Sequence, residues 1–410
     1  MPEQRLVLEK CGVVDPGDIE SYLELDGFRA LTKARRAMTP EEVIAAVKAS
    51  GLRGRGGAGF DCGRKWEMAR RAEGEETFLI CNADEGEVGT FKDRFILEND
   101  PFTLIEGIAI AGYAIGARRA YVYLRAEYHR LLGRLLGAIE QTRERGFLAN
   151  LDLQVCEGAG AYICGEESAL LNSIEGRRGE ARFRPPFPTE SGLWGCPTIV
   201  HNVETLMNVP AIIARGPDWF AGFGTAQSKG TKVFSVSGDV ASSGVYELPM
   251  GSRLRELVVD LCGAGSVKMV QLGGAGGSIL PARLLDTPLS YETVLGSGGV
   301  TVFDESRSVI DIVHRDLEFF ADESCGKCTP CREGTEAMLE MLGRLERGDG
   351  REPDLEALED LSEVMMLSSL CGLGQAAAVP VRDSLLHFRR EYQDRIEKSL
   401  FLRSIQGAGR

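Results

Sequence analysis

The sequence predicts an α/β protein in three parts: an α/β domain over residues 1–228, a small α+β domain over 229–308 and a helical domain over 309–410. Three observations support this division. Helical and strand-like patterns alternate in the first part, short strand-like runs broken by glycine dominate the second, and only helical periodicity remains in the third. A chain of 410 residues is long enough for about three domains with buried cores.

The first part is predicted to alternate strands with helices. Residues 39–51 are typical of a helix, because Thr39 is a good N-cap and Gly51 a good C-terminal stop. Further helices are predicted at 64–72, 102–117 and 129–144, and strands at 77–84, 119–124 and 151–158. Strand, helix and strand in succession at these lengths indicate a mostly parallel sheet.

The second and third parts differ in their periodicity. Strand-like runs in the second part occupy 232–240, 244–250, 266–274 and 299–304, with one helical segment at 253–263. Helical runs in the third part occupy 308–324, 333–348, 354–370 and 381–400. The second part therefore predicts a small α+β domain, and the third predicts a helical bundle.

Composition narrows the classes of function. The chain is 43% hydrophobic and 26% charged, which is ordinary for a soluble globular protein. Its formal net charge of −14 argues against nucleic acid or an anionic membrane surface as the main partner. No signal peptide is seen at the N-terminus, and the most apolar segment, 102–117, is too short to cross a membrane and contains Glu106. We therefore expect a cytoplasmic protein without membrane insertion, whose cysteines are reduced.

Three cysteines follow one another at a spacing of three, in what looks like one loop. Cys325, Cys328 and Cys331 are too crowded for a regular helix, and neither a second Cys-x2-Cys knuckle nor spaced histidines accompany them as in structural zinc sites. A [4Fe–4S] cluster, which takes four thiolates, fits the spacing better. Cys371 is the best candidate for the fourth ligand, because it lies in a glycine-rich break between two helical runs. A buried core cysteine is the alternative.

A glycine-rich loop at 51–59 contains the pattern Gly-x-Gly-x-x-Gly. It follows a helix rather than a strand, so it is not the usual dinucleotide fingerprint. The glycines still allow close approach of the backbone to a ligand, and Arg53, Arg55 and Lys65 add positive charge in an acidic protein. A phosphate or cofactor site is therefore favoured over a flexible surface loop.

Two further segments place carboxylates beyond predicted strands. The segment 81–94 lies at the C-terminal end of a strand, where ligands bind in α/β proteins, although a solvated face is the alternative. In the segment 158–176 a glycine turn precedes two glutamates at the start of a helix, where simple capping is the alternative. The residues concerned are Asp84, Glu85 and Glu87 in the first segment, and Tyr162, Glu166 and Glu167 in the second.

Six motifs occur in order along the chain: RGRGGAGF…KW, CNADEGE-x-GTFKDR, GAGAYICGEE-x-ALLNSIEG, PPFP…GLWGCPT, NVETL-x-NVP and ESCGKC-x-PCREGT. Together they resemble the flavoprotein subunit of NADH dehydrogenases, which is the NADH-oxidising subunit of respiratory complex I. They also resemble the diaphorase subunits of NAD-linked hydrogenases and formate dehydrogenases. The matches run from about residue 9 to about residue 380.

This resemblance implies a Rossmann-like N-terminal domain that binds FMN with NADH stacked above it, a ubiquitin-like (SLBB) middle domain, and one [4Fe–4S] cluster in the helical domain. It implies hydride transfer between NAD(H) and FMN, followed by single-electron transfer to the cluster and to a partner subunit. The implied FMN contacts are Gly54, Arg55, Gly56, Lys65, Asn82, Asp84, Tyr162, Gly165, Glu166, Asn202 and Thr205. The implied NADH contacts are Phe60, Glu85, Glu87, Glu167 and Phe187, whose glutamates position the nucleotide rather than act as acids or bases. The implied cluster ligands are Cys325, Cys328, Cys331 and Cys371.

Four departures from the family pattern bear on the nucleotide and flavin sites. Asp61-Cys62 replaces a usual Pro-Thr, Met68 an aromatic residue, Val88 a proline and His201 an asparagine. None of these positions is a cluster ligand. They support one alternative, a structural or electron-relay subunit whose nucleotide site has decayed.

The resemblance also implies partners: a small thioredoxin-like [2Fe–2S] subunit and a larger iron–sulfur or catalytic subunit of the same complex. Two accessory modules of some relatives, an N-terminal thioredoxin-like [2Fe–2S] domain and a C-terminal two-cluster ferredoxin domain, are expected to be absent from this chain. The chain could reach the cytoplasmic face of a membrane through its partner subunits. The opening segment favours an NAD-linked hydrogenase or formate dehydrogenase, either of which can be electron-bifurcating, over respiratory complex I. A sodium-pumping electron-transfer subunit would need ferredoxin-type cysteine repeats that the chain lacks. A zinc-binding interaction module is the remaining alternative.

Overall fold

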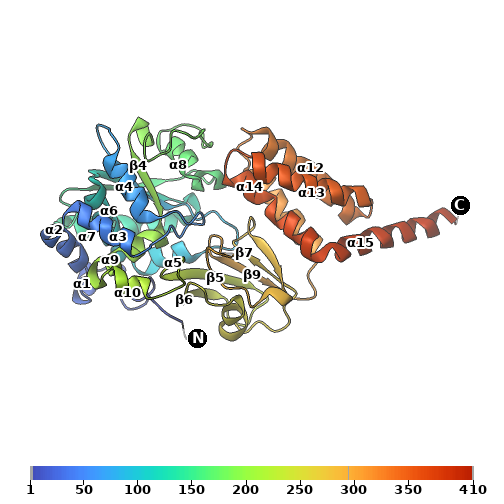
Figure 1. Ribbon diagram of the computed structural model, residues 1–410, viewed down its shortest axis with the longest axis horizontal. Helices are drawn as coiled ribbons and strands as arrows, with labels where there is room; N and C mark the ends of the chain where they lie inside the picture. The colour runs from blue at the N-terminus through green and yellow to red at the C-terminus, as the bar shows by residue number, and fades with distance from the viewer. Residues whose placement is uncertain (1–2, 294, 409–410) are drawn as a thin grey trace.

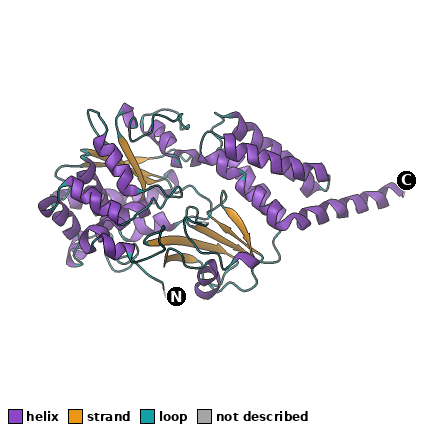
Figure 2. Cartoon of the chain, viewed as in Figure 1, coloured by secondary structure: helices purple, strands orange, loops and turns teal. Residues whose placement is uncertain are grey.

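The computed structural model describes residues 3–293 and 295–408 as two sheets and three groups of packed elements (Figure 1). The N-terminal part surrounds the first sheet, the second sheet lies beside it, and the C-terminal helices pack together on the other side of the molecule. The last helix, α15 (Val379–Ala408), extends away from the body (Figure 2).

The first sheet contains four parallel strands in the order β3-β2-β1-β4. Its strands are β1 (Phe78–Ala83), β2 (Arg119–Leu124), β3 (Asp152–Glu157) and β4 (Thr198–Asn202). The predicted parallel α/β sheet is confirmed, and the three predicted strands agree with β1, β2 and β3 to within one residue at each end. The fourth strand was missed, because it is short and follows an irregular proline- and glycine-rich segment.

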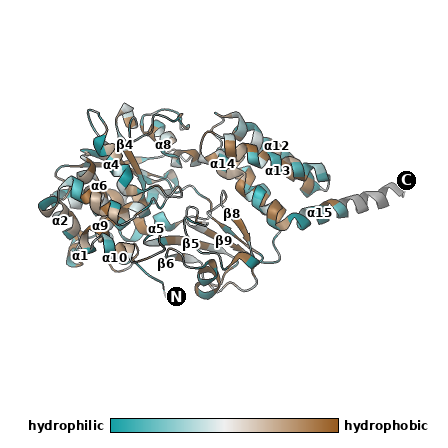
Figure 3. Cartoon of the chain, in the orientation of Figure 1, coloured by the Kyte–Doolittle hydropathy of each residue, from teal (hydrophilic) through white to brown (hydrophobic). Residues whose placement is uncertain are grey.

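Helices cover both faces of this sheet. The helices of the N-terminal part are α1 (Ile19–Glu24), α2 (Arg29–Ala37), α3 (Pro40–Ala49), α4 (Cys62–Arg71), α5 (Lys92–Asn99), α6 (Pro101–Ile115), α7 (Leu132–Glu144), α8 (Glu167–Ile174), α9 (Val203–Arg215) and α10 (Pro217–Ala221). Alternate residues of β1 enter different cores. Leu79 and Cys81 pack with α6 and α9, whereas Phe78 and Ile80 pack with α8 in a core that continues into the C-terminal helices. Figure 3 shows the apolar residues concentrated on the strands and the inner helices.

Glu106 lies within the most apolar helix of the chain and is buried. Its carboxylate accepts hydrogen bonds from the backbone N–H groups of Phe28 (2.9 Å) and Leu31 (3.0 Å) and from the hydroxyl of Tyr22. Helix α2 has no side-chain cap of its own, because its N-cap residue Phe28 has no side-chain acceptor. Glu106 therefore supplies the acceptor that the N-terminus of α2 needs.

The second sheet is mixed, with strand order β6-β5-β9-β7-β8 and one parallel pair, β5 with β9. Its strands are β5 (Thr231–Gly238), β6 (Gly244–Pro249), β7 (Met269–Leu272), β8 (Ser278–Pro281) and β9 (Gly299–Phe303). The predicted helical segment contains a π-helical turn at Glu256–Leu261, and strand β8 was not predicted. The ubiquitin-like assignment of this part stays a prediction.

The N-terminal segment lies against the second sheet. Backbone N–H groups of Leu6, Val7 and Leu8 donate to the carboxylate of Glu247 on β6, at 2.9–3.0 Å. The first residues thus contact a part of the chain that the sequence assigns to a separate domain. The division at residues 228 and 308 stays a proposal.

The C-terminal part is helical, as predicted. Its helices are α11 (Val309–Glu323), α12 (Thr329–Arg347), α13 (Glu352–Ser368), α14 (Gly372–Ala377) and α15, which is interrupted at Phe388. Across the described residues, no helix has both the length and the apolar character required to span a membrane.

Replacing Glu106 with leucine should destabilise the protein by about 3–5 kcal/mol, because two backbone N–H groups and the Tyr22 hydroxyl lose their acceptor in the core. Urea unfolding followed by circular dichroism measures this loss. Glu140→Leu is the matched control, since Glu140 is exposed and its ion pair is with Arg143 on its own helix; it should change stability by less than about 0.5 kcal/mol. Equal stabilities of the two variants would contradict the capping role.

Candidate functional site

The four predicted cluster cysteines line one pocket. Cys325 lies in the loop after α11, Cys328 is the N-cap of α12, and Cys371 is the N-cap of α14. Cys331 lies in the first turn of α12, so the prediction that all three close cysteines share one loop is wrong for this residue. The helix can begin so early because Pro330 fits a first turn, where its missing N–H costs no hydrogen bond.

The backbone next to Cys331 is closely packed at Gly374. A side chain at Gly374 would place its Cβ 2.6 Å from the Ser369 hydroxyl oxygen and 2.8 Å from Cβ of Cys331, so only glycine fits there. The rest of the lining is largely apolar, with Ile163, Leu370 and Leu373, and also includes Ser324 and Lys327. Four thiols in one pocket match the ligand set of an iron–sulfur cluster.

Two helix N-termini provide the positive electrostatic environment of the pocket. Burial raises the pKa of the Cys371 thiol to about 11, and the backbone N–H groups of Leu373 and Gly374 oppose this rise by hydrogen bonding to the sulfur. Among the described residues, no three histidine, cysteine or carboxylate side chains are close enough to hold a single metal ion. Four thiolates are the ligand set that a [4Fe–4S] cluster takes.

Asparagines mark the carboxyl edge of the first sheet, where β1 and β4 end. Asn82 and Asn202 are register partners on these strands. The Asn82 amide donates to the carbonyl oxygen of Gly165 (2.9 Å), while its oxygen accepts from the N–H of Asp84 (3.0 Å). The glycine-rich loop approaches the same edge, since a Cβ on Gly56 would lie 3.0 Å from Cβ of Asn202. Parallel strands gather ligand-binding residues at this edge.

Asp84 has an unsatisfied oxygen at this edge. Its Oδ2 is buried and has no hydrogen-bond partner among the described residues. Burial raises the pKa of the carboxyl group to about 7, although the positive charge of Arg125 opposes the rise. A buried acceptor without a donor fits a ligand that brings one, such as a ring N–H or a ribityl hydroxyl of FMN.

The glycine-rich loop is held between α9 and the second part of the chain. The Arg55 N–H donates to the Thr205 hydroxyl (2.8 Å), and the Tyr291 hydroxyl donates to the Gly54 carbonyl. The buried guanidinium of Arg55 donates to the carbonyl of Lys229 (2.6 Å), whereas its Nε has no partner within the described part of the chain. A contact between Arg55 and FMN can therefore use Nε, but the Arg55 backbone N–H is already occupied.

Lys65 and Glu167 form an ion pair next to this loop. The Lys65 ammonium donates to Glu167 (3.0 Å) and to the carbonyl of Val200 (2.9 Å). Burial raises the pKa of Glu167, but the charges of Lys65 and Arg184 outweigh it and hold the pKa below the ordinary value. Glu166 caps α8 and also pairs with Arg184. Two predicted FMN contacts and one predicted NADH contact thus meet at the start of α8.

Glu85 is buried, and its carboxylate accepts hydrogen bonds from groups of the protein itself. Its carboxylate accepts from the N–H groups of Asp93 (2.9 Å) and Arg94 (3.0 Å) at the start of α5, and from the hydroxyl of Tyr128 (3.0 Å). Burial and the charge of Asp93 raise its pKa. These bonds show that Glu85 supports the start of α5, and its contact with NADH stays a prediction.

Glu87 lies where the three parts of the chain meet. Its carboxylate accepts from the Tyr162 hydroxyl (2.7 Å) and from the N–H of Gly276 beside the second sheet (3.3 Å). Tyr162 packs edge-on against Phe319 and Phe320 of α11, with ring centroids 5.0 and 5.9 Å away. Burial raises the pKa of Glu87.

Two predicted NADH contacts are exposed aromatic rings. Phe60 is 48% and Phe187 47% exposed, which is unusual for phenylalanine. Exposed rings of this kind can stack on a nucleotide base. Their role in binding NADH stays a prediction.

The departures at residues 61 and 201 have local structural roles. Asp61 caps α4 by accepting from the N–H of Arg64 (2.7 Å). His201 accepts from the indole N–H of Trp66 (2.6 Å), and burial, together with the charge of Lys65, holds its pKa well below the ordinary value. A neutral histidine here preserves the packing of α4 against β4.

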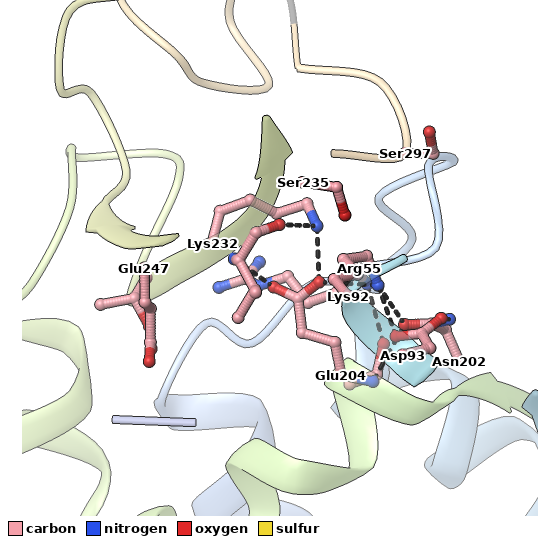
Figure 4. A network of polar contacts seen from close by, with 12 residues as sticks. Arg55, Lys92, Asp93, Asn202, Glu204, Lys232, Ser235, Glu247 and Ser297 are labelled. Carbon is pink, nitrogen blue, oxygen red and sulfur yellow. Dashed lines mark hydrogen bonds and ion pairs between the residues drawn. The ribbon is translucent and has the colours of Figure 1, made fainter. Parts of the chain in front are cut away.

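Sequence reasoning missed five residues around this site: Lys92, Asp93, Glu204, Lys232 and Tyr291 (Figure 4 shows the first four). The first three lie inside motifs that carry the family resemblance, so the motifs themselves were an available signal. Lys232 and Tyr291 lie in the second part of the chain and have no such local signal.

Comparison with known proteins agrees with this geometry. The Nuo51 FMN-binding domain matches residues 47–211, and the NADH-ubiquinone oxidoreductase-F iron–sulfur binding region matches residues 311–395. An NADH-quinone oxidoreductase subunit of Rhizobium meliloti (strain 1021) is 45% identical over 96% of this chain and 98% of its own length. The chain belongs to the family of FMN- and [4Fe–4S]-binding subunits of NADH-quinone oxidoreductases. The predicted cofactors FMN and [4Fe–4S] are thereby confirmed, and the chain is an oxidoreductase subunit of a family that acts on NADH.

Hydrogenase subunits show the same degree of similarity to this chain. NADP-reducing hydrogenase subunit HndC of Solidesulfovibrio fructosivorans is 45% identical over 96% of this chain and 84% of its own length. A crystal structure of an NAD+-reducing [NiFe]-hydrogenase in the air-oxidized state superposes with a TM-score of 0.88 at 42% identity, covering 96% of this chain and 67% of that one. The H2-reduced state gives a TM-score of 0.84 at 45% identity, and there the match spans 87% of this chain and 62% of the hydrogenase chain.

Cys371→Ser should abolish the cluster and leave FMN bound, because the fourth thiolate is lost while the sheet edge is untouched. Iron analysis and the EPR signal of the reduced protein measure the cluster, and flavin absorbance measures FMN. Cys262→Ser, in the separate core of the second sheet, is the matched control and should keep both. A full cluster signal in Cys371→Ser would refute the ligand assignment.

Asp84→Asn should stabilise the flavin-free protein more at pH 8 than at pH 5. The difference in unfolding free energy between variant and wild type should be roughly 1–3 kcal/mol larger at pH 8. The pKa of Asp84 is raised from 3.8 to about 7 on folding, so the folded protein binds this proton more tightly. Wild-type stability therefore falls as the pH rises from about 4 to about 7, and the amide removes this loss. Urea titrations at both pH values test the expectation, with Asp152→Asn on the exposed edge of β3 as control. A difference independent of pH would contradict the burial of the Asp84 charge.

Proposed function

We propose that the chain exchanges electrons between NAD(H) and a partner subunit through FMN at the carboxyl edge of the first sheet and a [4Fe–4S] cluster in the C-terminal part. One observation carries the proposal. The segment 162–165 belongs to both sites, because Ile163 lines the cysteine pocket while the carbonyl of Gly165 accepts from Asn82 at the sheet edge. A short segment shared by both sites supports electron exchange between cofactors bound at its two ends.

The residues of the chain bind and orient in this proposal, and bound FMN and cluster supply hydride exchange with NAD(H) and one-electron transfer. Asn82, Asp84 and Asn202 offer the flavin polar partners at the sheet edge, and Lys65 supplies positive charge beside the glycine-rich loop. Phe60 and Phe187 offer the nucleotide exposed rings. Glu87, fixed by Tyr162, places negative charge where the three parts meet and limits how tightly a polyanionic dinucleotide binds.

Activity of the isolated chain decides between this proposal and the alternative of an electron-relay subunit with a decayed nucleotide site. The chain loaded with FMN and cluster should reduce ferricyanide with NADH as donor. Intact Lys65, Glu167, Phe60 and Phe187 support this expectation. A chain that binds FMN and the cluster but neither binds NADH nor reduces ferricyanide would favour the relay.

Glu167→Gln should change the KM for NADH and the inhibition by NAD+ more than it changes the flavin content. In the wild-type chain Lys65 and Arg184 pair with the negative charge of Glu167. Without that charge, both cations attract the anionic dinucleotide more strongly. Steady-state kinetics and the flavin-to-protein ratio measure the two effects. Glu157→Gln, which removes an exposed pairing with His129, is the control. An unchanged KM for NADH together with unchanged inhibition by NAD+ would refute the role of Glu167 in nucleotide binding.

The parent complex is part of the proposal. Relatives are named as subunits of hydrogenases and of NADH-quinone oxidoreductases, which supports a multisubunit assembly. We propose a small thioredoxin-like [2Fe–2S] subunit and a larger iron–sulfur or catalytic subunit as partners, in an NAD-linked hydrogenase or formate dehydrogenase, of a bifurcating or a simple kind, or in complex I. A cytoplasmic location belongs to the same proposal. Identifying the subunits that co-purify with the chain tests these statements together.

A further inference from the structure

A buried ionic network joins the two sheets next to Asn202 at the carboxyl edge of the first sheet (Figure 4). We call this edge, where FMN is proposed to bind, the flavin edge. Glu204, in the first turn of α9, accepts from Lys92 of α5 (3.0 Å) and from Lys232 of β5 (2.5 Å). Lys92 also contacts Asp93 (2.6 Å). None of these four side chains is more than 3% exposed. Charges buried to this degree are tolerated only when they are paired.

The network fixes the side chain of Asn202. The amide oxygen of Asn202 accepts from the Lys92 ammonium (3.3 Å) and from the N–H of Glu204 (3.0 Å). The amide nitrogen donates to the carboxylate of Asp93 (2.6 Å). Both ends of the amide are therefore held in one orientation, directly beside Gly56 of the glycine-rich loop.

Lys232 is the member that comes from the second sheet, and it has little freedom. A Cβ on Gly298 would lie only 2.8 Å from the Lys232 ammonium, so the surrounding chain closely confines it. Both oxygens of Glu204 are used, one by the N–H of Val233 (2.8 Å) and the other by the two lysines. Burial raises the pKa of Glu204, but the two lysines outweigh it and hold the pKa below the ordinary value.

We propose that Lys232 is a positioning residue of the flavin site, which makes the second sheet a functional component of that site. Lys232 shares the negative charge of Glu204, so Lys92 can keep its contacts with Asp93 and Asn202. Lys232 also balances the buried charges next to the proposed flavin. The inference rests on the proposed binding of FMN at this edge. Without Lys232, Glu204 keeps Lys92 as its cation within this network, so Lys92 is drawn from Asn202 and the site carries one additional negative charge.

Three variants separate charge from packing: Lys232→Met, Glu204→Gln and the double variant. Each is prepared as the full chain, and the Kd for FMN is measured by quenching of flavin fluorescence. The midpoint potential of bound flavin is measured by redox titration. Lys232→Met should weaken FMN binding at least about ten-fold and lower the potential, because the added negative charge opposes both the FMN phosphate and the charge gained on reduction. Glu204→Gln should raise the potential, and the double variant should return both quantities towards wild type.

Lys268→Met is the matched control. It removes a lysine of the same part of the chain whose ion pair, with Glu391 of α15, lies away from the flavin edge. It should leave the Kd and the potential unchanged. A purely structural network predicts lower stability in the variants with the flavin Kd and potential of wild type, and that result would overturn the inference.

The experiment also gives a clear result if Lys232→Met does not fold, if all variants match wild type, or if wild type binds no FMN. If Lys232→Met does not fold, Glu204→Gln decides alone: a raised potential supports the inference, and an unchanged one overturns it. If the wild-type chain binds FMN and is reduced by NADH while all variants match it, only this inference fails. If the wild-type chain binds no FMN, the proposed function fails with it.

Discussion

The pairing of Glu204 with Lys92 and Lys232 is the interaction on which the arrangement of the two sheets around the flavin edge depends. None of these charges can remain buried alone, so α5, α9 and β5 must pack at one place. The constraint is stronger than shape complementarity, because a shift of any one element leaves an unpaired charge in the core. The side-chain amide of Asn202 is held in one orientation by Lys92 and Asp93 of this network.

The cluster pocket depends on a different kind of constraint, continuity of the core. The face of the first sheet that carries Phe78 and Ile80 packs with α8, and the same cluster of apolar residues continues through Phe320 to Cys331. Tyr162 and Glu87 lie on this path. The carboxyl edge of the first sheet and the cysteine pocket are therefore two ends of one packed region.

Much of the site was predictable because its residues occur in short motifs with a chemical reason for their spacing. Cys325, Cys328 and Cys331 indicated a cluster, and Cys371 was placed by its glycine-rich surroundings; all four line one pocket. Prediction was weaker where burial decides the role of a carboxylate. Glu85 and Glu87 stand two residues apart in one acidic loop, yet Glu85 supports α5 and Glu87 contacts Tyr162.

The sequence by itself determined the classes of secondary structure, the candidate cluster cysteines, the glycine-rich loop and the family. These features are local, so a window of a few residues contains the physical cause of each. Only the tertiary structure decided which buried charges pair: Glu106 with the start of α2, Glu247 with the N-terminal segment, and Glu204 with Lys232. Such partners lie 28 to 241 residues apart in the chain. They are chosen by the cost of leaving a charge or an N–H group unsatisfied in the core, which no local pattern records.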